Sequence, residues 1–368
     1  MMRRTLLAAL LLMPLPASAA DYFFYSGTYT DGSSKGIYAW RFHDADGSMA
    51  PLGLVAETPE PAHIWITPNG KYLYTVNWLQ DGAVSAYAID RHTGALKFLN
   101  KVSAHGADPN QVVVDPSGRV AVTVNYISGT IAAYKIGPDG KLSGAFYTEK
   151  HQGKPLSDKQ PGPKQHGVEF SRDGRFMFVT DLGLDRVYSY RFDAAKPSIV
   201  PFDPPYVLTH AGAGPRRLQL SPNGRYLYVD HETDSEVQVF AVDGGQLKSL
   251  QTLSTIPPDF TGRNSTAEIL VSADGRFVYV TNRGHDSIAI FAADPRTGLL
   301  RRIGNMPSGG KSPRNIRFGP NGDYLFAANQ AGNNITEFKV DKASGHLTQT
   351  GVVLSIDQPG GMYFVGAE

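Results

Sequence analysis

The sequence predicts an all-β fold, a seven-bladed β-propeller with four-stranded blades. A tight turn closed by glycine recurs six times, at spacings of 48, 56, 50, 51 and 47 residues, and short apolar runs flank each turn. Four strands in about 50 residues is the period of one propeller blade. The chain of 368 residues also contains 39 Gly and 25 Pro, too many for a helical bundle or a coiled coil. We therefore expect one large domain built from repeats.

Residues 1–20 are predicted to be a signal peptide. Arg3 and Arg4 supply a positive region, residues 5–15 are apolar but too few to span a bilayer, and Ala17-Ser18-Ala19 is a small-residue cleavage site. The order of these features favours a signal peptide over a buried first helix. No later apolar run is long enough to be an anchor, so we expect a periplasmic or secreted protein without membrane contact after cleavage.

Charge and composition exclude several kinds of partner. The chain has 35 Lys and Arg against 34 Asp and Glu, a formal net charge of +1 that becomes −1 if Arg3 and Arg4 are removed. Such a chain has no broad basic field, so nucleic-acid binding is not expected and any anion site must be local. Without Cys the chain can form neither a disulfide nor a thiolate metal site.

Each of the six complete units reads as a hairpin followed by further strands. In the first, Ile64-Trp65-Ile66 precedes the turn at Gly70, and an alternating run, Tyr72 to Val76, follows it. A third run follows a small polar turn, and a Thr-Gly or Asp-Gly turn often leads to a fourth. The turn glycines are Gly70, Gly118, Gly174, Gly224, Gly275 and Gly322. The third runs are 84–89, 131–134, 187–190, 237–240, 288–291 and 335–338.

The two ends of the chain are predicted to form the seventh blade together. Residues 361–365 match the first strand of a blade, and residues 22–26 and 36–41 match the later ones. A domain spanning 21–368 would then close on a composite blade, and truncating either end should destabilise the whole ring. Closed sheet edges and a near-neutral charge favour a monomer. Two polar inserts, His151 to Gln165 and Ser254 to Thr266, are expected to form loops over one face.

Counting from each turn glycine gives four columns of equivalent positions. Positions eight and seven before the glycine begin the first strand, which lies nearest the axis, and positions seven and eight after it end the second strand. All four columns therefore lie at the same end of the hairpins, around one mouth of the channel. In chain order the columns are Ala62, Asn110, His166, Arg216, Ala267, Arg314; His63, Gln111, Gly167, Arg217, Glu268, Asn315; Asn77, Asn125, Asp181, His231, Asn282, Asn329; and Trp78, Tyr126, Leu182, Glu232, Arg283, Gln330.

Ionisable residues gather in half of this ring. The set contains three cations, two carboxylates and one imidazole, namely Arg216, Arg283, Arg314, Glu232, Glu268 and His166. Arg offers a fork for a carboxylate or phosphate, and His or Glu can take a proton from water. Structural pairing between blades, such as Arg314 with Glu268, is the alternative. For Asn77, Asn125 and Asn329, we favour turn formation over ligand contact.

Other motifs of catalysis or metal binding are absent from the sequence. There is no G-x-S-x-G, and His231-Glu232 lacks the second His of H-E-x-x-H. The remaining scattered histidines fall mostly in polar turns without ligand spacing, so we expect them at the surface and predict no metal and no cofactor. They are His43, His92, His105, His151, His210 and His346.

The chain resembles the seven-bladed propeller lactonases, a family that includes 6-phosphogluconolactonases and carboxy-cis,cis-muconate cyclases. The resemblance covers residues 22–366. Its most specific stretches are Gly27 to Thr30, Asp181 to Val187, Gly212 to Arg216, Asp259 to Gly262 and Asn282 to Ser287. It implies a site at one channel mouth that uses His, Arg and Glu without a required metal, at positions that fall on His166, Arg216, Glu232 and Arg283.

The chain departs from the family pattern toward a more cationic site. Where the family often has Pro-His-x-His, this sequence has Lys164 two residues before His166, and Arg217 stands where a His often follows Pro-Arg. The resemblance implies a lactonase acting on a small anionic, sugar-type and possibly phosphorylated lactone. A muconate cyclase that binds a carboxylate, and a binding protein without turnover, are the alternatives. Further predicted substrate contacts are Arg314, Glu268, Asn282, His285, Lys164 and Arg217.

Overall fold

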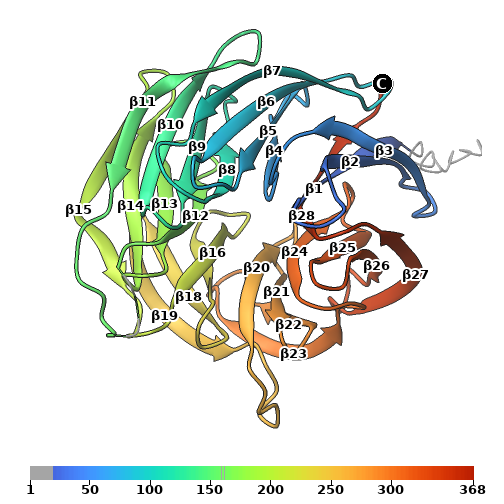
Figure 1. The fold of residues 1–368 in the computed structure, drawn as a ribbon. Coiled ribbons are helices and arrows are strands. Elements are labelled where there is room, and N and C mark those ends of the chain that lie inside the picture. The colour runs from blue at the N-terminus through green and yellow to red at the C-terminus, as the bar shows by residue number, and fades with distance from the viewer. Residues whose placement is uncertain (1–19, 159, 161) are drawn as a thin grey trace, which may run out of the picture.

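Seven four-stranded antiparallel sheets follow one another around a ring in the computed structural model (Figure 1). The structure describes residues 20–368 apart from 159 and 161, so the predicted signal peptide lies outside the described residues except for Ala20. Every regular element in the described part is a strand, and no helix there could cross a membrane. The predicted seven-bladed β-propeller is thus confirmed.

Six sheets are built from consecutive strands. The first three are β4 Ile64–Ile66, β5 Tyr72–Asn77, β6 Ala83–Ile89, β7 Leu96–Ser103; β8 Pro109–Val114, β9 Val120–Asn125, β10 Thr130–Ile136, β11 Leu142–Lys150; and β12 Gln165–Phe170, β13 Phe176–Asp181, β14 Arg186–Asp193, β15 Ser198–Leu208. The next three are β16 Pro215–Leu220, β17 Tyr226–His231, β18 Glu236–Asp243, β19 Gln246–Ser254; β20 Ser265–Val271, β21 Phe277–Arg283, β22 Ser287–Ala293, β23 Leu300–Pro307; and β24 Pro313–Phe318, β25 Tyr324–Asn329, β26 Asn334–Val340, β27 Leu347–Ser355.

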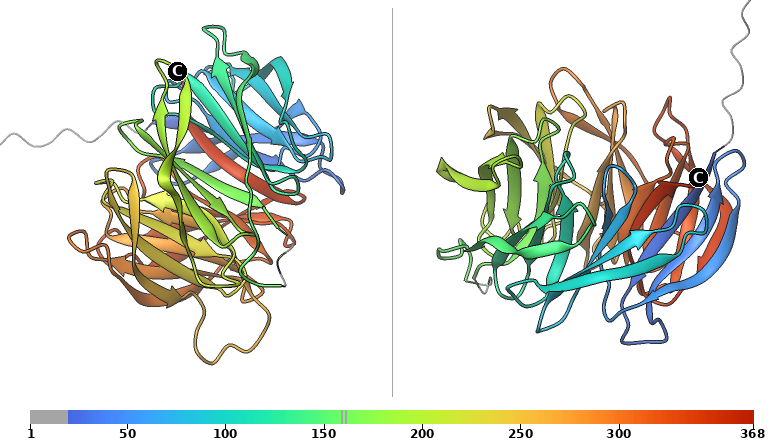
Figure 2. Two further views of the ribbon diagram at one scale, coloured as in Figure 1. Left: turned by 90° about the vertical axis from the view of Figure 1, so that its left-hand side faces the viewer. Right: turned by 90° about the horizontal axis from the view of Figure 1, so that it is seen from above.

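The seventh sheet joins the two ends of the chain. Its strand order is β28 (Pro359–Gly366), β1 (Asp21–Thr28), β2 (Gly36–His43) and β3 (Met49–Glu57). Phe23 of β1 pairs with Val365 of β28 in an antiparallel register. The blue strands of the N-terminal end and the red strand of the C-terminal end therefore lie side by side, as Figures 1 and 2 show. The composite blade predicted from the sequence is present.

The hydrophobic core lies between neighbouring sheets. All residues of β9 are buried, and alternate ones face the same neighbour: Val122 and Val124 pack in one cluster with Met177 and Val179 of β13. Adjacent blades cover both faces of the second strands, whereas outer strands such as β3 are mostly exposed. The blades are thus stabilised mainly by their neighbours.

Glycine turns also join the blades. Gly345 has φ +77°, and a Cβ added there would lie 2.3 Å from the ring of Phe277 in the preceding blade. The hydroxyl of Tyr279 donates a hydrogen bond of 2.8 Å to the carbonyl of the same glycine. Only glycine combines this backbone conformation with such a close ring contact. Gly140, beside Tyr72 and Tyr74, has the same arrangement.

Candidate active site

Bulges at the start of the inner strands direct adjacent residues into the channel. In β16, Pro215 pairs with His231 but Leu218 pairs with Val229, so three steps on one strand match two on the other. Regular alternation would send Arg216 and Arg217 to opposite faces of the sheet, whereas the extra residue of a bulge re-aims a side chain. Both arginines therefore reach the same mouth of the channel, which is lined by the starts of the inner strands.

Glu232 holds two guanidinium groups of neighbouring blades. Nε of Arg216 donates to its Oε2 at 2.6 Å, and Nη2 of Arg283 lies 3.2 Å from the same oxygen. Burial opposes ionisation of Glu232, but the charges of Arg216 and Arg283 outweigh it and lower the pKa of the carboxyl. Nη1 of Arg216 and Nε of Arg283 are buried without a hydrogen bond. Each arginine thus keeps a donor atom that the protein does not use.

His166 lies beside this ion pair as a neutral imidazole. Its Nε2 is 3.9 Å from Oε2 of Glu232, its ring packs edge-on against Tyr126, and its Nδ1 is buried without a hydrogen bond. Burial, reinforced by the charge of Arg216, lowers the pKa of His166 well below its ordinary value. An imidazole that stays neutral can accept a proton across the physiological pH range.

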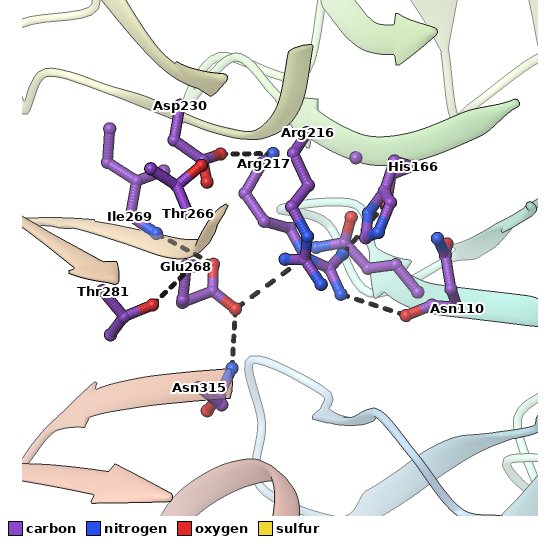
Figure 3. A network of polar contacts seen from close by, with 12 residues as sticks. Asn110, His166, Arg216, Arg217, Asp230, Thr266, Glu268, Ile269, Thr281 and Asn315 are labelled. Carbon is purple, nitrogen blue, oxygen red and sulfur yellow. Dashed lines mark hydrogen bonds and ion pairs between the residues drawn. The ribbon is translucent and has the colours of Figure 1, made fainter. Parts of the chain in front are cut away.

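Arg217 lies between Glu268 on one side and Asn110 on the other (Figure 3). Its guanidinium donates to the carbonyls of Asn110 at 3.0 Å and His166 at 3.2 Å, and its Nε lies 3.8 Å from Oε2 of Glu268. Asn315 donates to that same Glu268 oxygen at 2.6 Å. Burial lowers the pKa of Arg217 to about 10 and raises that of Glu268. These two predicted substrate contacts are engaged with other residues of the channel wall.

Arg314 and Lys164 place cationic groups over aromatic rings at the mouth. The guanidinium of Arg314 lies 5.2 Å from the ring centres of both Tyr29 and Trp78, and the Lys164 ammonium lies 4.2 Å from that of Tyr126. The alternative pairing of Arg314 with Glu268 is wrong, because Glu268 instead contacts the neighbouring Arg217 and Asn315. Stacking on rings positions these two cations without neutralising them.

Asn282, predicted to contact substrate, points away from the mouth. It is fully buried, accepts a hydrogen bond of 2.7 Å from the Thr255 hydroxyl and donates one of 3.1 Å to the Thr255 carbonyl. This placement corrects the prediction, because both polar atoms are already bonded. His285 bonds Ser287 at 2.6 Å and packs against Phe260 of the neighbouring loop, so it lies on the rim.

The other column asparagines have structural contacts, but these contacts reach the preceding blade and do not form the predicted local turns. Asn77 bonds Thr58 and Pro59, Asn125 bonds Ala104, and Asn329 bonds Ser308. Each of these partners lies near the end of an outer strand in the preceding blade. The column therefore latches one blade to the next.

His151 is not at the surface, contrary to the sequence prediction. It is buried, and its ring nitrogens bond Asp181 at 2.9 Å and the Tyr190 hydroxyl at 2.8 Å. Asp181 accounts for this error. Asn77, Asn125 and Asn329 bond backbone carbonyls of the preceding blade, whereas the carboxylate of Asp181 bonds the imidazole of His151. His210 is half-exposed, as predicted, and its ring lies in a cluster with three other potential metal ligands.

The structure adds residues that the sequence argument did not select. Tyr29, His63, Asn110 and Asn315 line the narrow space at the mouth together with His166, Arg216, Arg217 and Arg314. Both side-chain polar atoms of Asn110 are buried without a hydrogen bond. Burial lowers the pKa of His63 well below its ordinary value, so it too stays neutral. Apart from Tyr29, these residues stood in the columns but carried no charge that marked them.

Comparison with known proteins decides the family. The family model described as "Lactonase, 7-bladed beta-propeller" matches residues 23–364, nearly the whole described ring. The chain belongs to the seven-bladed β-propeller lactonases. Membership assigns it to the lactone-hydrolysing carboxylic ester hydrolases, and it confirms the resemblance read from the sequence.

Named relatives of this lactonase family cover nearly the full chain. The 6-phosphogluconolactonase of Bacillus subtilis is 33% identical over 347 residues, 92% of this chain and 97% of that protein. The 6-phosphogluconolactonase of Formosa agariphila is 31% identical over 88% of this chain and 94% of its own length. The solved structure of the Pseudomonas aeruginosa periplasmic gluconolactonase PpgL superposes with a TM-score of 0.90 at 33% identity, covering 95% of this chain and all of that one.

Proposed function

We propose that this lactonase hydrolyses a small, sugar-type lactone with an anionic group at the channel mouth. The observation that carries the proposal is the grouping of Arg216, Arg283 and Arg314 around the neutral imidazole of His166, with unused donor atoms on the first two. One carboxylate, Glu232, ion-pairs with the first two of these cations. An anionic substrate would offset the positive charge that Glu232 leaves unbalanced.

His166 is the proposed general base. It would take a proton from water as the water oxygen attacks the lactone carbonyl, and Arg216 or Arg283 would stabilise the oxyanion that forms. When the ring C–O bond breaks, the imidazolium returns its proton to the leaving oxygen, which gives a hydroxy acid. Glu232 is better suited to hold the arginines, because its Oε2 is already engaged by both guanidinium groups.

The names of the relatives support a sugar-lactone substrate. Two of them are called 6-phosphogluconolactonases and a third a gluconolactonase. The cationic character of Lys164, Arg217 and Arg314 favours a phosphate or carboxylate on the ligand. We also propose export to the periplasm or outside the cell, which rests on the signal sequence and on the periplasmic location named for PpgL.

The test is a pH-stat assay of the purified chain. The panel contains 6-phosphogluconolactone, glucono-δ-lactone and a carboxymuconate, each with the parent and with Arg283→Ala. Arg175→Ala is the matched control, because Arg175 is exposed and lies beside the turn at Gly174, at the opposite end of its hairpin from the mouth.

We expect turnover of a lactone by the parent and by Arg175→Ala, and a loss of about 10- to 150-fold for Arg283→Ala. That range corresponds to about 1.5–3 kcal/mol for one charge-assisted hydrogen bond. Ring closure of the muconate without lactone hydrolysis would replace the proposal with the cyclase alternative. Binding of lactones without turnover would favour a binding protein.

A further inference from the structure

Of the six blades with a glycine turn between their first two strands, one lacks a latch that the other five share. In the column seven residues after the turn glycine, Asn77, Asn125, Asn282 and Asn329 each bond a residue of the preceding blade, and Asp181 bonds His151. The partner in each case lies at the end of the outer strand or directly after it. The same contact recurs because every blade must be fixed to its predecessor.

His231 occupies this position in the blade of β16 to β19. Its side chain is fully buried, yet neither ring nitrogen has a hydrogen bond. Thr209, which stands where Thr58 and Thr255 stand in other blades, has a buried hydroxyl that is also without a hydrogen bond. A buried imidazole without a partner is costly, so another group is needed to satisfy it.

Three other potential ligands surround His231. Asp234 and Glu236 come from the turn and the first residue of β18, and His210 comes from the segment between β15 and β16. The facing atoms of the four residues lie within 4.8 Å of one another. None of the other five blades in the column has a carboxylate at the positions of Asp234 and Glu236; Gln80 and Gly82, for example, stand there in one blade and Ser128 and Thr130 in another.

The distances suit an ion better than direct contacts. Nδ1 of His231 lies 3.7 Å from Oδ1 of Asp234 and 3.9 Å from Oε2 of Glu236, and Nε2 of His210 lies 3.8 Å from that same glutamate oxygen. These separations are too long for hydrogen bonds. Ligand atoms about 2.0–2.1 Å from a tetrahedral Zn²⁺ are roughly 3.3–3.5 Å apart, so small movements would bring all four onto one ion. His210 Nε2 and Asp234 Oδ2 are already in closer contact.

We propose that His210, His231, Asp234 and Glu236 bind a divalent transition-metal ion of the Zn²⁺ type. Two imidazoles with two carboxylates form a donor set for Zn²⁺ rather than for Ca²⁺ or Mg²⁺, which prefer oxygen ligands alone. The ion would join the β15–β16 connection to the β17–β18 turn, as the asparagine latch does elsewhere. The proposal does not depend on lactone hydrolysis.

Co²⁺ binding to the full chain, previously dialysed against EDTA, tests the site. Co²⁺ reports a tetrahedral nitrogen and oxygen environment through strong visible absorption, and Zn²⁺ should displace it and abolish the absorption. We expect one Co²⁺ per chain, and a melting temperature that rises with Zn²⁺ because the ion binds the folded state. Mg²⁺ should cause no such rise.

His231→Asn is the decisive variant, since it restores the residue that four other blades carry and should fold. Its Co²⁺ affinity should fall by at least about 100-fold, because even outer-shell changes cost 10- to 100-fold. Glu236→Thr is a second variant of the ligand set, because Thr130 occupies the equivalent position of another blade. His43→Ala is the matched control, since His43 pairs with Asp21 alone and should leave binding unchanged.

Three results would overturn the proposal. They are the absence of intense Co²⁺ absorption in the parent, undiminished affinity in both His231→Asn and Glu236→Thr, and an equal loss in His43→Ala. Lactone turnover measured on the same samples is a separate readout, so failure of the metal site and failure of the proposed hydrolysis can be told apart.

Discussion

Arg216 in β16 and Glu232, the residue directly after β17, are joined by a hydrogen bond of 2.6 Å from Nε to Oε2. Arg283 of the next blade shares the same carboxylate oxygen at 3.2 Å. One acid therefore fixes two cations of different blades at the channel mouth. The remaining donor atoms of the arginines are left for a ligand, and the geometry of the site depends on the charge of Glu232.

Replacing Glu232 with Gln should weaken catalysis without abolishing it. Gln cannot offset the arginine charges, and losing one charge-assisted bond of about 1.5–3 kcal/mol lowers kcat/KM about 10- to 150-fold. Initial rates on the best lactone, with circular dichroism as a check of folding, measure this. A loss above about 1,000-fold would identify Glu232 rather than His166 as the base, since general-base catalysis contributes 10²- to 10⁴-fold.

The pH profile should show that His166 is neutral in the free enzyme. Burial and the charge of Arg216 lower the pKa of His166. Its neutral, proton-accepting form therefore persists at pH values well below the ordinary His pKa of about 6.5. The acid limb of kcat/KM should therefore lie below pH 6.5, and His166→Gln should remove about 10²- to 10⁴-fold of the rate. An acid limb centred at or above about pH 6.5 would contradict this.

The two neutral histidines of the channel should make stability fall in acid. The folded pKa of both His63 and His166 is lowered, so the unfolded chain binds protons below about pH 6.5 that the folded chain excludes. The free energy of unfolding should decrease by up to about 1.4 kcal/mol per pH unit for each group. Urea titrations on both sides of that pH measure it, and the double Gln variant should show a smaller slope.

Arg314 should act on charged substrates more than on neutral ones. It is held over Tyr29 and Trp78 rather than by a carboxylate, so its charge remains available. Arg314→Ala should raise KM for a phosphorylated lactone by about 10-fold or more, as expected for one charge-assisted contact, and change KM for glucono-δ-lactone little. Equal effects on both substrates would mean that Arg314 packs the rim rather than binding an anion.

Alanine should be tolerated less well in the turn at Gly345 than at Gly351, which lies within β27. Both have positive φ, +77° and +92°, so each Ala pays about 1–2 kcal/mol of backbone strain. Only at Gly345 would the new Cβ meet a ring, that of Phe277, which adds about 1–3 kcal/mol of overpacking. The urea midpoints of the two variants measure their losses of stability. Equal losses would contradict the expected clash between the new Cβ and the ring of Phe277.

The sequence predicts the ring well because glycine turns and apolar alternation are local signals repeated in every blade. It also brings His166, Arg216, Glu232 and Arg283 to one mouth, since strand ends follow from the repeat. It does not predict which way each side chain points. The bulge that turns Arg216 and Arg217 into one channel depends on strand pairing.

Residues whose contacts come from a neighbouring blade are harder to predict. Asn282 stands in a mouth column but bonds Thr255, and His151 lies in a polar insert but is buried against Asp181. Both results depend on the neighbouring blade, which no local pattern describes. His210 and His231 lie 21 positions apart in the sequence, and only the connection between blades brings them together.

The pairing of β28 with β1 constrains how the molecule can be made. Until Pro359–Gly366 is available, the sheet that contains β1 lacks its innermost strand, and the interfaces to both neighbouring blades are incomplete. A nascent chain emerging from the ribosome can therefore assemble individual blades but not the finished ring. Such delayed completion makes the native state a property of the whole chain.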